Sequence, residues 1–194
     1  MVSWSAIYLA LVALVALERA GELWLSRRNA RRAFAHGAVE LGTRDYRVMT
    51  LFHSAFLVAC AAQALLQRRA HADVVAGVAL AGAVAAQALR YWAIAALGER
   101  WNTRVIVLPG APAVVSGPYR FIRHPNYVAV ALEMLCLPLA LGATASGALL
   151  ALVFFIGNAL ILRRRIRTEE AALGPGYARA FAHRPRFIPG GAGW

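Results

Sequence analysis

The sequence predicts an all-α integral membrane protein with about five transmembrane helices, of which the last two form a tight helical hairpin. Hydrophobic residues make up 60% of the 194 residues, and the mean hydropathy of +0.56 is too high for an ordinary soluble domain. All 21 basic residues are arginine, which gives a net charge of +12. These arginines cluster between the apolar runs, a distribution typical of the loops that set membrane topology.

Residues 1–97 predict three transmembrane helices. The apolar runs are residues 2–25, 48–66 and 74–97. Each is long enough to cross about 30 Å of hydrocarbon at about 1.5 Å per residue. The segment 27–47 is predicted to be a loop that carries six arginines, so the positive-inside tendency places it in the cytoplasm. The short turn 67–73 carries only Arg68 and Arg69, so we expect it on the outer side.

A few side chains in these runs depart from the apolar pattern. Glu18 and Glu22 are four residues apart and share a helix face, where Arg19 partly compensates them. We expect them at the headgroup level, and a role in a polar pocket is the alternative. His53 is expected to be a packed or interfacial histidine and not a ligand. A small-residue stripe suited to close helix packing consists of Gly77, Ala81 and Ala85. The sequence alone does not place these groups in a functional site.

Residues 98–194 predict a catalytic region made of a loop, a helical hairpin and a cytoplasmic tail. The loop contains the β-branched run 105–107 and is expected to be extended and ordered over the helices. Residues 128–162 hold one charge, Glu133, and are interrupted at 142–147, so each arm is short and the pair predicts a hairpin. Glu133 is either a site residue or the partner of a polar group on a neighbouring helix.

The polar stretch 116–127, SGPYRFIRHPNY, immediately precedes this hairpin. If the two arms run out and straight back, then His124 and Tyr127 at its start meet Arg165 and Glu169 at its end. Arg165 and Glu169 share a face if the last helix continues past the membrane. The pocket formed this way lies at the cytoplasmic side, where it suits a polar cofactor from the cytoplasm and an apolar acceptor from the bilayer. A basic membrane anchor is the alternative interpretation.

Several other kinds of site lack their sequence signatures. There is no G-x-G-x-x-G after a strand, no P-loop, no H-E-x-x-H and no C-x-x-C, and the five histidines form no metal-ligand set. Cys60 and Cys136 lie in apolar runs and are expected to be free thiols. No basic stripe with interleaved aromatic residues indicates nucleic-acid binding.

Four motifs, taken in order around the hairpin, resemble the membrane-embedded isoprenylcysteine carboxyl methyltransferases and their bacterial relatives, which use S-adenosylmethionine without a Rossmann domain. The motifs are Ser116-Gly117-Pro118-Tyr119, Arg123-His124-Pro125-Asn126-Tyr127, the R-x-x-x-E-E of residues 165–170, and Tyr177, Phe181 and Pro185-Arg186-Phe187-Ile188-Pro189. The resemblance covers residues 97–189, about half of the chain.

The resemblance implies roles for particular residues. The S-adenosylmethionine site would be lined by Ala113, Val114, Tyr119, His124, Pro125, Asn126, Tyr127 and Glu169. Arg165 would face the acceptor, and His124 is the nearest candidate base for a hydroxyl acceptor. The segment AALGPG between Glu170 and Tyr177 is shorter than in the prenylcysteine enzymes, so the lid over the cofactor would be reshaped.

The acceptor implied is a lipophilic or prenylated molecule that enters from the bilayer. The N-terminal half looks more like bacterial relatives that methylate hydroxyls of alkylresorcinols or alkylpyrones, so the acceptor oxygen is either a carboxylate or a hydroxyl. An NADPH-dependent membrane lipid or sterol reductase is an alternative, because some carry a similar G-x-x-R-H-P-N-Y stretch. A protein without enzymatic activity that binds anionic lipid is another. We expect a multi-pass protein of the bacterial cell membrane with a cytoplasmic C-terminus.

Overall fold

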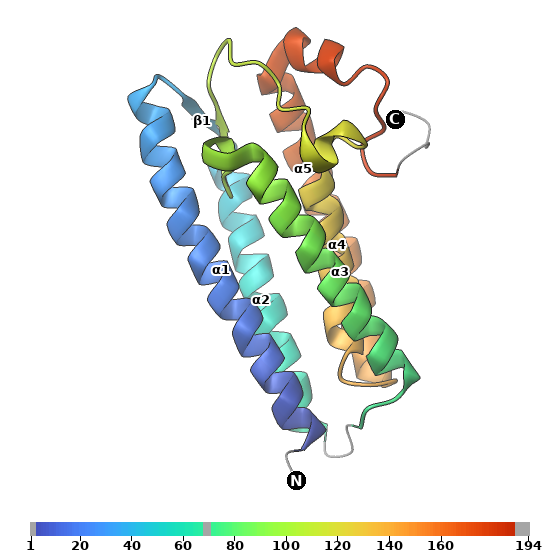
Figure 1. The fold of residues 1–194 in the computed structure, drawn as a ribbon. Helices are drawn as coiled ribbons and strands as arrows, with labels where there is room; N and C mark the ends of the chain where they lie inside the picture. The colour runs from blue at the N-terminus through green and yellow to red at the C-terminus, as the bar shows by residue number, and fades with distance from the viewer. Residues whose placement is uncertain (1–2, 68–70, 189–194) are drawn as a thin grey trace.

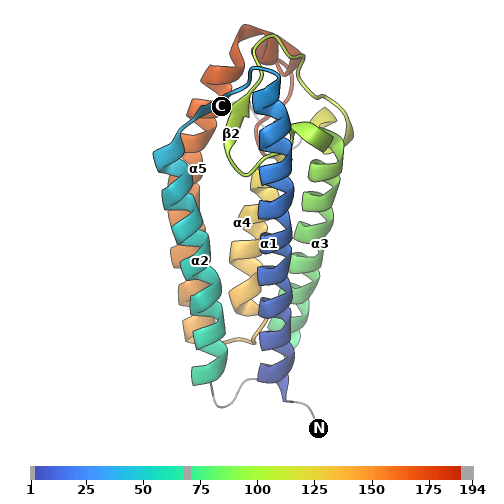
Figure 2. The same cartoon turned by 90° about the vertical axis from the view of Figure 1, so that its left-hand side faces the viewer.

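The computed structural model describes residues 3–67 and 71–188. Five α-helices run along one long axis and form an elongated bundle (Figures 1 and 2). They are α1 (Trp4–Ala35), α2 (Thr43–Leu66), α3 (Val74–Leu97), α4 (Pro125–Leu139) and α5 (Ala145–Ala180). The shorter elements are β1 (Val39–Leu41), η1 (Gly98–Arg100), β2 (Val105–Val107) and η2 (Gly117–Arg120). These shorter elements all lie at one end of the bundle, which we call the arginine-rich end (Figure 1).

The prediction of an all-α membrane protein is confirmed. Three stretches are long and apolar enough to cross a membrane: Thr43–Leu66, Val74–Arg100 and Ala145–Ala180. The apolar α4 has 15 residues, about 22 Å at 1.5 Å per residue, which is short of a full crossing. A count of five crossings therefore stays a prediction. Val2, the turn arginines Arg68 and Arg69, and Pro189 lie outside the described residues.

α4 and α5 form the predicted hairpin, and side-chain caps fix the end of the bundle opposite the arginine-rich end. Thr144 caps α5 by accepting a hydrogen bond from the Gly147 amide at 3.0 Å. Asp73 caps α3 through the Ala76 amide and also accepts from the Ala143 amide, at 2.7 and 2.8 Å. These two backbone hydrogen bonds hold the pKa of Asp73 below its usual value. The start of α3 is thereby tied to the turn between α4 and α5.

The segment 27–47 is largely helical and not a loop as predicted. α1 continues to Ala35 and α2 begins at Thr43. Arginine and alanine are good helix formers, and no glycine or proline interrupts α1 between Gly21 and Gly37. The remaining residues form β1, which pairs antiparallel with β2 in the register Val39 with Val107 and Leu41 with Val105. The sequence predicted an extended segment at 105–107 but not its partner strand.

The predicted packing stripe on α3 was wrong. Gly77, Ala81 and Ala85 are exposed, and the buried small residues of α3 are Ala76, Ala79, Ala83, Ala86 and Ala93. Gly82 lies close to α4, because a Cβ built there would lie 2.7 Å from Sγ of Cys136. Since nearly every residue of α3 is small or apolar, spacing alone does not identify the buried face.

Gly157 makes the contact between α5 and α2 possible, which leads to a stability prediction. A Cβ at this position would lie 2.6 Å from Cζ of Phe52, and the Phe52 ring is packed against Phe154 at a centroid distance of 5.0 Å. We expect Gly157→Ala to lower the free energy of unfolding in detergent by about 1–3 kcal/mol relative to Gly77→Ala. Gly77 is the matched control because no atom lies within 4 Å of its Cβ position. Equal stability of the two variants would contradict close packing at Gly157.

Candidate active site

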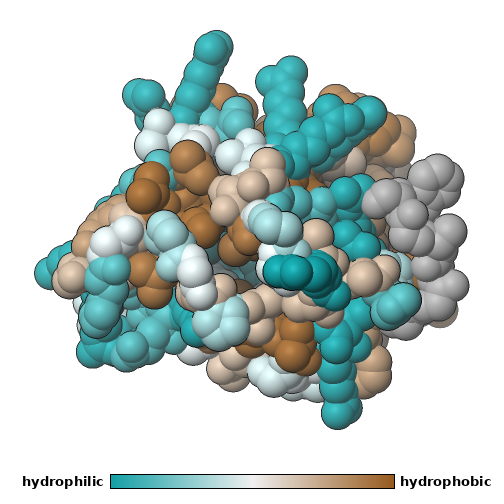
Figure 3. Space-filling view, turned by 90° about the horizontal axis from the view of Figure 1, so that it is seen from above, coloured by the Kyte–Doolittle hydropathy of each residue, from teal (hydrophilic) through white to brown (hydrophobic). Residues whose placement is uncertain are grey.

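A large cavity of about 450 Å³ lies at the arginine-rich end. Viewed onto this end, long hydrophilic side chains surround a more apolar centre (Figure 3). Its walls come from the end of α1, the loop 97–114, η2, the start of α4 and the part of α5 that carries Arg165 and Glu169. Sequence elements far apart in the chain therefore meet around one space large enough for a nucleoside-sized ligand.

In the wall of this cavity, the start of α4 contacts α5. The hydroxyl of Tyr127 donates to the carboxylate of Glu169 and accepts a hydrogen bond from Nε of Arg165 at 2.8 Å. Arg165 is only 7% exposed, and its Cζ lies 5.8 Å from the centre of the Tyr127 ring. The two ends of the hairpin meet as its geometry predicted, because α5 stays helical through these positions.

His124 differs from the expected arrangement, because its partner is Glu170 and not Glu169. Nε2 of His124 lies 3.0 Å from Oε1 of Glu170, and its ring stacks on Tyr127 at 5.2 Å with an interplanar angle of 15°. Glu170 also accepts two hydrogen bonds from Arg186, at 3.0 and 2.6 Å. His124 is therefore held in a fixed orientation at the edge of the cavity.

The C-terminal segment folds back over the site. α5 is interrupted at Gly174, whose φ of +70° favours glycine, and the chain returns toward the start of α4 (Figure 1). The backbone amides of Arg123 and His124 donate to the carbonyls of Pro185 and Arg186, at 3.0 and 3.1 Å. Tyr177 and Phe181 from this segment line the cavity. The segment thus closes one side of it.

The loop before α4 supplies the opposite wall. Ala113 and Val114 line the cavity together with Tyr119, and burial raises the pKa of Tyr119, so that it stays a neutral phenol. Gly117 permits this approach to α3: its φ is +58°, and an added Cβ would lie 2.7 Å from Cβ of Ala96. Any other residue at position 117 would strain the backbone and collide with α3, so glycine allows this wall to lie against the helix.

Eight of the nine residues predicted for the site line the large cavity. They are Ala113, Val114, Tyr119, His124, Asn126, Tyr127, Arg165 and Glu169. Pro125 does not line it; it is a buried residue in the first turn of α4. Lining residues that were not predicted include Trp101 and Asn102 of the loop, and Arg32 and His36. Arg32 and His36 reach the cavity because α1 continues to Ala35, which the sequence did not predict.

A small cavity of about 130 Å³ lies beside the large one, deeper in the bundle. The two cavities share part of their walls, namely Trp101, Asn102, Asn126, Tyr127 and Arg165. The other walls of the small cavity include α1 residues Arg19 and Glu22, α2 residue His53 and α3 residue Arg90. His53 contacts Asn158 of α5, with 3.4 Å between Nε2 and Oδ1. Side chains that the sequence alone did not place in the site therefore border it.

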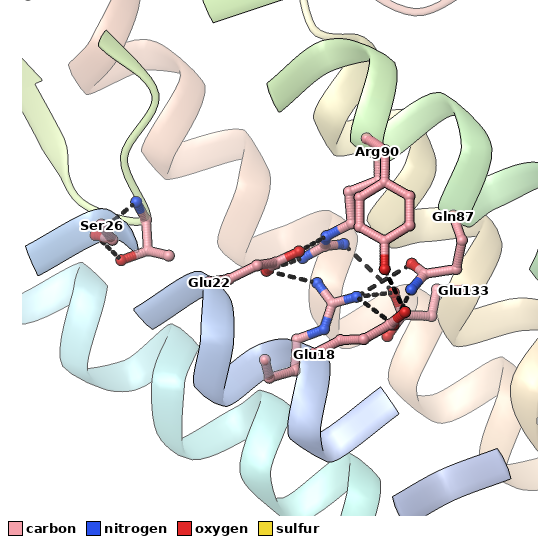
Figure 4. Close-up of polar contacts among 9 residues, drawn as sticks. Glu18, Glu22, Ser26, Gln87, Arg90 and Glu133 are labelled. Atoms are coloured by element: carbon pink, nitrogen blue, oxygen red, sulfur yellow. Dashed lines mark hydrogen bonds and ion pairs between the residues drawn. The ribbon is translucent and has the colours of Figure 1, made fainter. Parts of the chain in front are cut away.

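A buried ionic network joins α1, α3 and α4 at this cavity (Figure 4). Nε of Arg90 donates to Glu22 at 2.6 Å, and Nη1 of Arg90 donates to Glu133 at 3.3 Å. Arg19 donates to the same two carboxylates, at 2.8 and 3.2 Å. Glu22 and Glu133 are each 8% exposed, so Glu22 lies inside the bundle instead of at its surface. A lone arginine inside an apolar run was a sequence signal that could have found Arg90.

The chain is similar to a known protein family and to two bacterial proteins. Residues 77–175 match the model described as the isoprenylcysteine carboxyl methyltransferase (ICMT) family. An uncharacterized Bacillus subtilis protein, YpbQ, is 37% identical over 163 residues, which cover 84% of this chain and 94% of the relative. An uncharacterized Haemophilus influenzae protein is 30% identical over 152 residues, covering 78% and 86% of the two chains.

The ion pair between Arg186 and Glu170 should control how firmly the C-terminal segment closes the cavity. We expect Arg186→Ala to increase amide hydrogen exchange in residues 177–188 about tenfold, because a charge-assisted, two-point contact is lost. Arg184→Ala is the matched control, since the contacts of this side chain with the carbonyl of Ala180 and the ring of Phe181 lie within its own segment. If both variants exchange like the unmodified protein, the ion pair does not hold the segment.

Proposed function

Because the chain belongs to the isoprenylcysteine carboxyl methyltransferase family, we propose that it is an S-adenosylmethionine-dependent methyltransferase with a lipophilic acceptor. The observation that carries the proposal is the Tyr127 contact with Arg165 and Glu169, because Tyr127 and Arg165 line both cavities and Glu169 lines the large one. One cavity has the size for a cofactor, and the other lies among the helices. A donor and an acceptor would meet at this wall.

The residues around the large cavity fit S-adenosylmethionine. The Glu169 carboxylate can accept hydrogen bonds from ribose hydroxyls, and the aromatic rings of Tyr177 and Phe181 offer surface for an adenine. Oδ1 of Asn126 is buried and has no hydrogen-bond partner among the described residues, so it is free to accept one from a ligand. Ala113 and Val114 add apolar contact. When bound, the cofactor supplies a methyl group on a sulfonium, ready for in-line displacement.

Arg165 would orient the acceptor oxygen from the shared wall. Its Nε is committed to Tyr127, and its Nη1 has only the thioether of Met49 at 3.7 Å, so the guanidinium retains donors for an oxygen. A carboxylate acceptor, as in a prenylcysteine-like lipid, would need alignment and the exclusion of water. A hydroxyl acceptor, as in an alkylresorcinol- or alkylpyrone-like lipid, would also transfer its proton to a base, and His124 is the nearest candidate.

The same proposal includes an orientation in the membrane. The arginine-rich end would face the cytoplasm of a bacterial cell, with the C-terminus on that side, because arginines concentrate in the segments at this end. The polar cofactor would then enter from the cytoplasm, and the acceptor would enter from the bilayer.

Glu169→Gln tests the cofactor site. We expect the affinity for S-adenosylhomocysteine to fall about tenfold, because an amide accepts hydrogen bonds more weakly than a carboxylate. Calorimetric titration of the purified protein in detergent measures this affinity. Asp45→Asn is the control, because Asp45 is a carboxylate in the first turn of α2 and lines neither cavity. Unchanged affinity in a folded Glu169→Gln variant would remove Glu169 from the cofactor site.

Arg165→Lys tests the acceptor side. Lysine keeps the charge but loses the planar fork, so we expect kcat/KM for the acceptor to fall about a hundredfold, with cofactor affinity changed less than about threefold. Arg167→Lys is the matched control, because Arg167 is exposed on the same helix and lines neither cavity. A larger loss in cofactor affinity than in acceptor turnover would place Arg165 in the cofactor site.

A further inference from the structure

The small cavity reaches the flank of the bundle, beside a helix suited to a membrane. Ser54 lines the cavity and is exposed on α2, and Leu23 and Leu57 lie half-buried along it. α2 is one of the helices long and apolar enough to cross a membrane. A ligand that enters past Ser54 would therefore come from the bilayer and not from water.

The inner walls of this cavity are polar, although it lies within the helices. Arg19, Glu22 and Arg90 form one side, and His53 and Arg165 lie on others. Burying charged groups costs free energy unless each is paired and hydrogen-bonded. An alkyl chain would leave such walls unsatisfied, so the occupant must place a polar head group here and its apolar tail toward the mouth.

The cations at the inner wall of the small cavity already have carboxylate partners. Arg19 and Arg90 bond Glu22 and Glu133 directly, and Glu18 joins this network through Gln87. Arg165 lies in the wall shared with the large cavity, where its Nε bonds the Tyr127 hydroxyl and its other donors remain available. An anionic head group beside Glu22 would thus face a carboxylate and two paired cations, so an uncharged head group fits better there.

Two residues of the small cavity hold a buried donor without a hydrogen-bond partner in the described chain. The donors are Nε of Arg19 and Nε1 of Trp101. Trp101 is 2% exposed, so water at the protein surface does not satisfy its indole nitrogen. A hydroxyl can accept a hydrogen bond from such a donor and still donate one, so a hydroxylated head group matches these walls.

Glu22 is the network carboxylate that lines the cavity, and it retains hydrogen-bonding capacity. It accepts three hydrogen bonds, from Nη1 of Arg19 and from Nε and Nη2 of Arg90. A carboxylate has about four acceptor sites, so one more donor can be accommodated. Resting on the methyl transfer proposed above, we propose that the small cavity binds the uncharged, hydroxylated head group of a bilayer amphiphile. Glu22 selects this head group by accepting a hydrogen bond from it.

Two variants of the same network separate recognition from structural support. Glu22→Gln and Glu133→Gln each remove one carboxylate bonded to Arg19 and Arg90, but only Glu22 lines the cavity. Binding of dodecylphenol to the protein in lipid nanodiscs is the readout, with S-adenosylhomocysteine as a second ligand. We expect Glu22→Gln to weaken dodecylphenol binding about tenfold, and Glu133→Gln less than about threefold. Equal effects of the two variants, or no effect of Glu22→Gln, would overturn the proposal.

A blocked mouth provides a second test that does not disturb the buried charges. Ser54→Trp places a large side chain at the cavity mouth, whereas Ala55→Trp places the same side chain on the exposed face beside it. We expect at least a tenfold loss of dodecylphenol binding for Ser54→Trp alone, with S-adenosylhomocysteine binding unchanged in both. Unchanged dodecylphenol binding to Ser54→Trp would place the head group elsewhere.

The two proposals fail in different ways. If the unmodified protein does not bind S-adenosylhomocysteine, the proposed function fails. If it binds S-adenosylhomocysteine but prefers dodecanoate to dodecylphenol, the methyltransferase proposal stands and the assignment of an uncharged head group is wrong.

Discussion

The hydroxyl of Tyr127 connects the two arms of the α4–α5 hairpin, because it donates to Glu169 and accepts from Arg165. Both cavities have Tyr127 and Arg165 in their walls, so the position of this hydroxyl sets where their contents can approach each other. The hairpin makes the contact possible: its arms run antiparallel, and α5 remains helical well past the level at which α4 begins (Figure 1). The geometry of the site therefore depends on α5 remaining helical through Arg165 and Glu169, before its interruption at Gly174.

The buried ionic network makes the N-terminal helices part of the same site. Arg90 on α3 joins Glu22 on α1 to Glu133 on α4, and breaking a buried ion pair typically costs about 3–5 kcal/mol. Such a cost inside an apolar bundle favours one relative position of the three helices. Because Glu22 and Arg90 also line the small cavity, the contacts that position the helices are the same ones that shape its inner wall.

The short apolar arms predicted the hairpin and that its two ends, which carry Tyr127, Arg165 and Glu169, would meet. The other predicted residues around the large cavity, such as Ala113, Val114 and Tyr119, came only from the resemblance to the family. The sequence did not predict that His124 contacts Glu170, since two adjacent glutamates differ only in the direction they leave the helix. The buried face of α3 was also not predictable, because alanine and glycine occur on all sides of it. The strand pair β1–β2 and the network at Arg90 depend on contacts between distant segments, which local patterns do not encode.

Titration of the purified protein with S-adenosylhomocysteine and, separately, with NADPH tests the central claim most directly. A cavity built around Glu169, Asn126 and the aromatic rings of Tyr177 and Phe181 should bind S-adenosylhomocysteine and not NADPH. Calorimetry in detergent distinguishes the two without knowledge of the acceptor. Saturable binding of S-adenosylhomocysteine alone is the result expected of a methyltransferase, whereas binding of NADPH alone, or of neither ligand, would contradict the account.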